Sequence, residues 1–214
     1  MPDIEITTLT AKHLRDIERV LVEAFAEHPL TRGLGGASGR YAGAMLGNIA
    51  ALAMTDKRAI VLGAISGGSL AGVAVIVPGK WEPSRGKVTW SFARLLLKVP
   101  LRAFKRAAEW MNGMWRAMRI VEKRDDELEL LFLAVRPEMQ RRGVGRALVE
   151  RARGIVSERG LRALRLEAVA GTSVVEFYAA LGFVCEADIA VDGHIIHVMR
   201  KTCAQSVKHQ NKGV

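Results

Sequence analysis

The residues best suited to chemistry form a short segment with two glycines, GlnArgArgGlyValGly at positions 140–145, followed at once by Arg146. The two glycines permit a tight turn, and a helix that begins there exposes backbone N–H groups to a ligand. Three arginines lie in or beside the first helical turn, where the helix dipole disfavours cations by roughly 0.3 to 1 kcal/mol each. This placement predicts a bound anion such as a phosphate. A glycine-containing loop with solvated arginines is the alternative.

Two β-strands and a helix must position this segment. The run 127–135 is strongly β-like, and ArgProGluMet then turns the chain into the glycine segment. The following helix has an apolar inner face, and Gly160 ends it. That face consists of Val144, Leu148, Ala152 and Ile155. A second strand over 164–169 is expected to lie parallel to the first, because such crossovers are right-handed and return to the same sheet.

The rest of the chain predicts an α/β fold with a mixed, mostly antiparallel sheet flanked by helices. We expect one domain over 1–200, with a helical insert at about 85–124, and a polar tail over 201–214. Further strands are predicted at 4–8, 59–65, 70–77, 184–190 and 195–200, with hairpin turns at SerGlyGlySer (66–69) and at Asp192 and Gly193. Further helices are predicted at 14–25, at 40–54 after a glycine-rich loop (33–39), within 87–124 with a break at Pro100, and from a capping box at Ser173 and Glu176 to Gly182.

Three motifs in this order resemble the GNAT family of N-acetyltransferases. They are LeuPheLeuAlaValArgPro (131–137), the glycine segment (140–145) and TyrAlaAlaLeuGlyPhe (178–183). The resemblance implies a GNAT-type fold and transfer of an acetyl or other short acyl group from acyl-CoA to a primary amine of a small molecule or peptide. The amine would attack directly within a ternary complex, and no metal is implied.

The resemblance also implies roles for individual residues. The strand backbone would pair with the pantetheine arm, and the glycine segment would hold the pyrophosphate. The implied cofactor-binding residues are Leu133, Ala134, Val135, Gln140, Arg141, Arg142, Gly143, Val144, Gly145 and Arg146. Where family members carry an asparagine at the start of the next helix, this chain has Gly171 followed by Thr172, so backbone or hydroxyl groups would make those contacts.

The same resemblance implies two catalytic residues. Tyr178 would protonate the departing thiolate, unless it is an ordinary half-buried helix tyrosine. Glu129 would act as the base, and strict alternation places it on the same face as Leu131 and Leu133. If Glu129 faces outward instead, water relays would take its place.

Composition limits the function classes. The chain has 214 residues and a formal net charge of +10, so at least one ligand or partner is expected to be anionic. No apolar run is long enough to span a bilayer and the start lacks signal-peptide order, so we expect a cytoplasmic protein. The two cysteines and five histidines show no metal-ligand spacing, and we assign no metal.

The basic segment 85–124 leaves other functions open. It carries eleven cations against two glutamates, with four tryptophans nearby. Such a segment can bind nucleic acid or an anionic membrane, although we favour helices that cover the sheet beside the acceptor site. The alternatives to an enzyme are therefore a basic binding module and a protein that binds acyl-CoA as a regulatory ligand without turnover. A homodimer also stays open.

Overall fold

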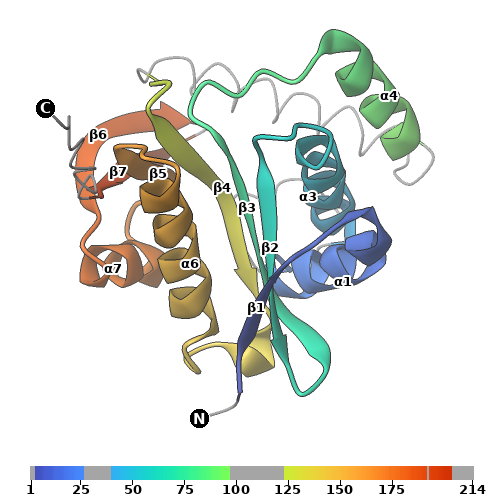
Figure 1. Cartoon of the computed structure of the whole chain (residues 1–214), viewed down its shortest axis with the longest axis horizontal. Helices are drawn as coiled ribbons and strands as arrows, with labels where there is room; N and C mark the ends of the chain where they lie inside the picture. The colour runs from blue at the N-terminus through green and yellow to red at the C-terminus, as the bar shows by residue number, and fades with distance from the viewer. Residues whose placement is uncertain (1–2, 27–39, 97–122, 192, 204–214) are drawn as a thin grey trace, which may run out of the picture.

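A computed structural model describes residues 3–26, 40–96, 123–191 and 193–203. Its centre is a seven-stranded sheet in the order β1-β2-β3-β4-β5-β7-β6 (Figure 1). The β4–β5 pair is parallel, and the other five neighbouring pairs in the described residues are antiparallel. The predicted α/β class with a mixed, mostly antiparallel sheet is thus confirmed.

The elements follow the predicted order. The strands are β1 (Glu5–Thr8), β2 (Ile60–Ser66), β3 (Ser69–Pro78), β4 (Glu127–Val135), β5 (Ala163–Val169), β6 (Val184–Val191) and β7 (His194–Thr202). The described helices are α1 (Leu14–Ala24), α3 (Arg40–Ala53), α4 (Arg85–Leu96), α6 (Val144–Glu158) and α7 (Ser173–Ala180), with single 3-10 turns at Ala11–His13 and Pro137–Met139. No helix in the described ranges is both long and apolar enough to cross a membrane.

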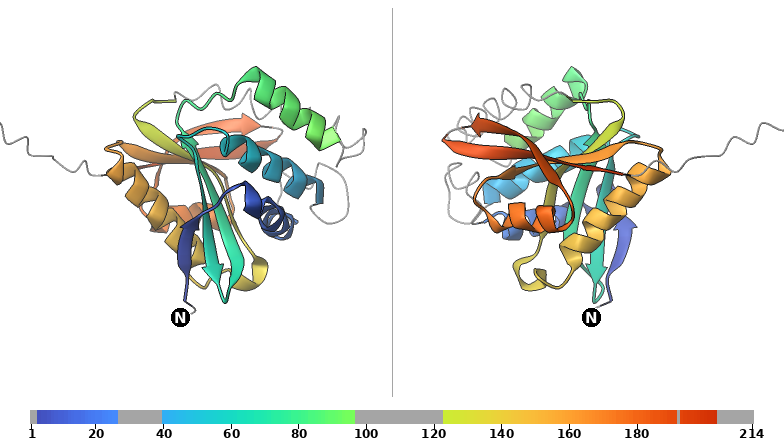
Figure 2. Two further views of the ribbon diagram at one scale, coloured as in Figure 1. Left: turned by 45° about the vertical axis from the view of Figure 1, so that its right-hand side comes forward. Right: turned by 90° about the vertical axis from the view of Figure 1, so that its left-hand side faces the viewer.

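Helices cover both faces of the sheet, and each face has its own core (Figures 1 and 2). On one face, α6 and α7 pack on the sheet, and the predicted inner face of α6 is buried as expected. On the other face, α1 and α3 pack against each other and the sheet. Strand β3 serves both cores by alternation, with Val73 and Val75 on the α1 side and Ala74 and Ile76 on the α6 side.

A β-bulge in β4 corrects the predicted facing of that strand. Val75 pairs with Phe132 and Ile76 with Leu130, so Leu131 is an extra residue. Strict alternation would put Leu131 and Leu133 on one face with Glu129. Instead, Leu131 packs against the α1-side core, whereas Leu133 packs against the α6-side core. The extra residue shifts the alternation by one position.

Several boundaries also differ from the prediction, among them the start of α7 and the end of β7. The residue that precedes α7 is Thr172, not Ser173, and no side-chain hydrogen bond caps the helix. Lys201 and Thr202 belong to β7 rather than to a tail, because they pair with Leu164 and Ala163 on the full length of β5. The predicted loop 33–39, the continuation of the insert over 97–122, Asp192 and the tail from 204 lie outside the described residues.

Candidate active site

The pairing between β4 and β5 ends partway along both strands. The last parallel pair is Leu130 with Leu166, whereas β4 continues to Val135 beside β3 alone. The bulge at Leu131 lies at this point, and a bulge bends its strand and increases the local twist. The backbone groups of residues 132–135 that face away from β3 have no strand partner in the described part of the chain. They form a ready edge for an extended ligand with amide groups.

The glycine segment follows this open edge and begins α6. Gly143 has φ +87° and Arg141 has φ +57°, and both values lie in the left-handed region. The first intrahelical bond runs from the Ala147 N–H to the Gly143 carbonyl, so the N–H groups of the three preceding residues have no partner within the helix. Residues 140–143 and Arg146 are exposed. The turn therefore has the geometry of an anion site with cationic surroundings.

Packing around Gly145 brings the first two motifs together with the helix that carries the third. A methyl group at this position would lie 3.4 Å from Cζ of Phe177 and 3.7 Å from side-chain atoms of Leu133 and Val135. The start of α6, the open end of β4 and helix α7 thus meet at one glycine. A hydrogen bond also connects the glycine segment to the end of β4, because Gln140 Nε2 donates to the Val135 carbonyl at 3.2 Å.

Tyr178 lies on α7, buried in the α6-side core. Its ring contacts Phe177 and Phe183, with centroid distances of 5.1 and 5.6 Å. Burial raises the pKa of the Tyr178 hydroxyl far above its ordinary value. The side chain consequently stays protonated at neutral pH, as a proton donor must. The hydroxyl of Thr172, which precedes α7, donates to the Val169 carbonyl at 2.7 Å, so it is already engaged within the protein.

Glu129 is buried within an ion-pair network. Only 3% of its side chain is exposed, and its two oxygens lie 3.0 Å from Lys123 Nζ and 3.0 Å from Arg165 Nη1. Arg165, which is the neighbour of Glu129 on β5, has no exposed side-chain surface. In this arrangement Glu129 compensates two cations and is held away from solvent.

Glu167 is a second carboxylate on the same face, and it was not among the site residues predicted from the sequence. It is bound to Arg165 Nη2 at 2.5 Å, and 15% of its side chain is exposed. It directly follows Leu166, the last residue of β5 that pairs with β4, so it lies where the strands part. Burial, and then the charge of Glu129, raise the pKa of Glu167 against the opposing effect of Arg165. Two signals together could have identified it. The alternation of LeuArgLeuGlu (164–167) puts Glu167 on the same face as Arg165, and the parallel register puts Arg165 beside Glu129.

A further buried pair continues this row of charges across the sheet. Glu127, at 1% exposure, accepts from Arg200 Nε at 2.8 Å and from the Arg124 N–H at 3.1 Å. Arg200 also contacts Glu186 on β6. The face of the sheet opposite α6 therefore carries alternating acidic and basic side chains from β4 to β6.

Comparisons with known proteins agree with this geometry. Residues 107–185 match the acetyltransferase (GNAT) domain family. The ribosomal protein bS18-alanine N-acetyltransferase of Escherichia coli K12 is 38% identical over 73 residues, which are 34% of this chain and 49% of that protein. The match thus spans about half the length of this curated relative.

Solved structures with the same fold match nearly the whole chain. Arylalkylamine N-acetyltransferase 2 of Aedes aegypti superposes with a TM-score of 0.66 at 18% identity, covering 94% of this chain and 100% of that one. The PaiA N-acetyltransferase of Thermoplasma acidophilum, solved in complex with coenzyme A, gives 0.58 at 18% identity, covering 94% and 98%. The predicted GNAT-type fold is confirmed.

We predict that Glu129→Gln lowers the stability of the protein strongly. The change removes the carboxylate that pairs with Lys123 and leaves Arg165 with Glu167 as its one described countercharge. Loss of one partner of a buried pair costs about 3 kcal/mol. Urea unfolding would measure the loss. Glu158→Gln is the matched control, because the Glu158–Arg151 pair is solvent-exposed and its loss is expected to cost less than about 1 kcal/mol. Equal losses in the two variants would contradict this interpretation.

Proposed function

With its resemblance to the GNAT family confirmed, we propose that this protein is an N-acyltransferase that moves an acetyl or other short acyl group from CoA to a primary amine. The observation that carries the proposal is the meeting of the open β4 edge, the anion-binding turn and the Tyr178 helix around Gly145. Each of these parts suits a different portion of acyl-CoA. A basic binding module would need only the turn.

In this proposal the cofactor is held mainly by backbone groups. The edge from Leu133 through Ala134 to Val135 pairs with the pantetheine arm, as an added strand would. The turn from Gln140 to Arg146 binds the pyrophosphate through N–H groups at the helix N-terminus and the exposed arginines. The complex of the Thermoplasma relative with coenzyme A supports CoA as the donor.

The reaction requires one proton to leave the amine and one to reach the sulfur. The neutral amine nitrogen attacks the thioester carbon, and backbone N–H groups at the open edge stabilise the oxyanion. The C–S bond then breaks, Tyr178 donates its proton to the departing sulfur, and a proton from solvent afterwards restores the Tyr178 hydroxyl. The amine proton passes to a carboxylate and on to solvent.

Glu167 suits the role of that carboxylate better than the predicted Glu129. Glu167 lies at the strand separation and is partly exposed, whereas two cations already engage the oxygens of Glu129. We therefore propose that Glu167 is the base that accepts the proton from the amine. In this proposal Glu129 holds Arg165 in place, and Arg165 in turn positions Glu167. The role of Glu129 as a base stays a prediction that activity measurements test.

The acceptor class is a primary amine on a small molecule or a peptide. The Escherichia coli relative is named for the alanine of a ribosomal protein, which favours a peptide α-amine as the first acceptor to try. A suitable screen follows release of free CoA thiol from acetyl-CoA with alanine-initiated peptides and small amines. Tight acyl-CoA binding with no amine-dependent release would favour the regulatory alternative.

We predict that Gly143→Glu abolishes acetyl-CoA binding in calorimetric titration. The substitution places a carboxylate in the proposed pyrophosphate turn at a left-handed residue. Gly160→Glu is the matched control, because Gly160 lies at the other end of α6 with φ +66° and open space around it. It suffers the same backbone strain and charge change, and is expected to bind acetyl-CoA like the wild type. Loss of binding in both variants, or in neither, would contradict the assignment of the turn.

We predict that Tyr178→Phe lowers kcat by about 100-fold or more with little change in acetyl-CoA affinity, because only the proton donor is removed. The ring and its contacts with Phe177 and Phe183 are kept. Steady-state thiol-release kinetics beside calorimetry would separate the two effects. Full turnover by the variant would remove Tyr178 from the mechanism.

We predict that Glu167→Gln lowers kcat/KM by about 100-fold at neutral pH and flattens the acid limb of the pH profile. A base with a raised pKa takes up its proton at higher pH than an ordinary glutamate, so wild-type activity falls early as the pH decreases. Glu176→Gln, an exposed change on α7, is the control and should keep the wild-type profile. An unchanged acid limb in Glu167→Gln would exclude Glu167 as the base.

A further inference from the structure

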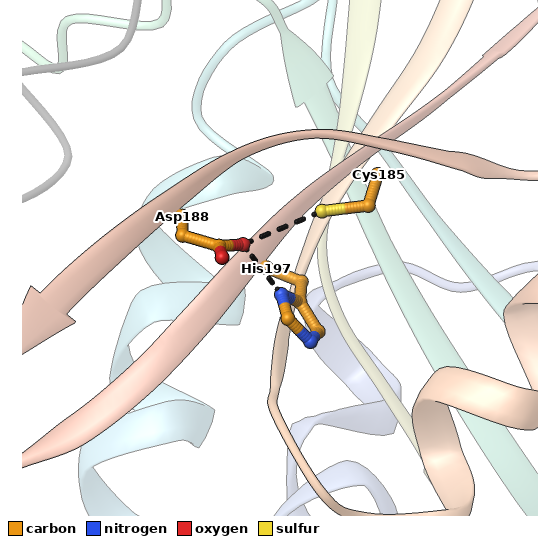
Figure 3. Close-up of side chains that lie close together, drawn as sticks. All are labelled: Cys185, Asp188 and His197. Carbon is orange, nitrogen blue, oxygen red and sulfur yellow. Dashed lines mark hydrogen bonds and ion pairs between the residues drawn. The ribbon is translucent and has the colours of Figure 1, made fainter.

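Three potential metal ligands meet on the β6–β7 hairpin, among the described residues (Figure 3). Cys185 and Asp188 come from β6 and His197 from β7, and Figure 3 shows the three side chains pointing toward one another. Asp188 Oδ1 lies 2.6 Å from His197 Nδ1 and 3.5 Å from Cys185 Sγ. The three ligand atoms all lie within 4.8 Å of one another.

Two features of the hairpin bring these residues together. Val191 pairs with His194 beside the turn, and the same register places Asp188 opposite His197. In a regular strand, residues three apart point to opposite faces. The register shift between Cys185 and Ala187 makes Glu186 an extra residue, so Cys185 turns to the same face as Asp188. Because the three residues show no metal-ligand spacing along the chain, the sequence did not predict this cluster.

The donor set and its spacing suit a transition-metal ion. A thiol, an imidazole and a carboxylate together favour zinc-like ions over calcium or magnesium, which prefer oxygen ligands alone. Tetrahedral zinc bonds of about 2.0 to 2.3 Å place donor atoms roughly 3.2 to 3.7 Å apart. The Cys185–Asp188 distance of 3.5 Å already fits. The shorter His197–Asp188 distance needs only a small side-chain rotation, and both side chains are partly exposed to solvent.

The same geometry disfavours a nucleophilic role for Cys185. An activated thiol would be hydrogen-bonded to the imidazole, which would act as its base. Here the Cys185 sulfur is hydrogen-bonded to the Asp188 carboxylate instead.

We propose that Cys185, Asp188 and His197 bind a divalent transition-metal ion, with Zn²⁺ as the first choice, and that water completes the coordination. As the metal–sulfur bond forms, the thiol proton passes to the buffer and the imidazole nitrogen binds in its neutral form. The ion links the edge strand β6 to β7 and fixes their register. None of the three residues belongs to the proposed acyl-transfer site, so this proposal stands apart from the proposed function.

The test uses the full chain with Co²⁺ as a spectroscopic probe and Zn²⁺ as the competitor. We expect one ion per chain, a sulfur-to-cobalt charge-transfer band, and loss of the band when Zn²⁺ is added. Cys185→Ser should abolish the band, and Cys185→Ser and His197→Gln should each weaken Zn²⁺ binding at least about tenfold. His194→Gln is the matched control, since His194 lies on the same strand outside the cluster.

A second readout does not depend on the variants. Zn²⁺ should slow alkylation of Cys185 by iodoacetamide, as followed by peptide mass spectrometry, and a chelator should restore the rate. Absence of a charge-transfer band in the wild type would overturn the proposal. It would also be overturned if Cys185→Ser and His197→Gln bound Zn²⁺ as tightly as His194→Gln.

Discussion

The parallel pairing of β4 with β5 ends after four residue pairs, and the proposed active site depends on that ending. Up to Leu130 the two strands hold each other through hydrogen bonds, and beyond it β4 is held by β3 alone. The open edge belongs to β4, the turn begins the crossover through α6 to β5, and the helix that carries Tyr178 directly follows β5. A ligand that entered here would complete the sheet and not disrupt it.

The row of buried charges beside the separation has a cost in stability. Arg165 is fully buried, and its Nε and Nη1 lack hydrogen-bond geometry even though Nη1 lies 3.0 Å from Glu129. Apolar residues of similar volume often give equal or greater stability than such a network. Stability alone therefore explains the network poorly. Its geometry keeps Glu167 partly exposed at the separation and fixes its position through Arg165, which fits a role in proton transfer.

Much of the fold could be predicted from local sequence, because apolar periodicity and turn residues decide the elements. The burial of Val144 and Leu148, the end of α6 at Gly160 and the hairpin around Gly193 are examples. The proposed role of Glu167 and the metal-ligand cluster at Cys185 could not be predicted from local sequence. Both depend on which strands become neighbours and on bulges that shift alternation, and these are properties of the assembled sheet.

The extra residue in β4 makes the open edge depend on the number of residues in the strand. Leu131 lies where the two strands part, and the residues after it would keep their faces if it were absent, because alternation would then be regular. Removing this one residue would straighten the strand and favour continued pairing with β5. Such a deletion would close the proposed cofactor site while every residue proposed to touch the cofactor stayed in the sequence. The proposed recognition of acyl-CoA thus depends on the number of residues in β4 as well as on their identity.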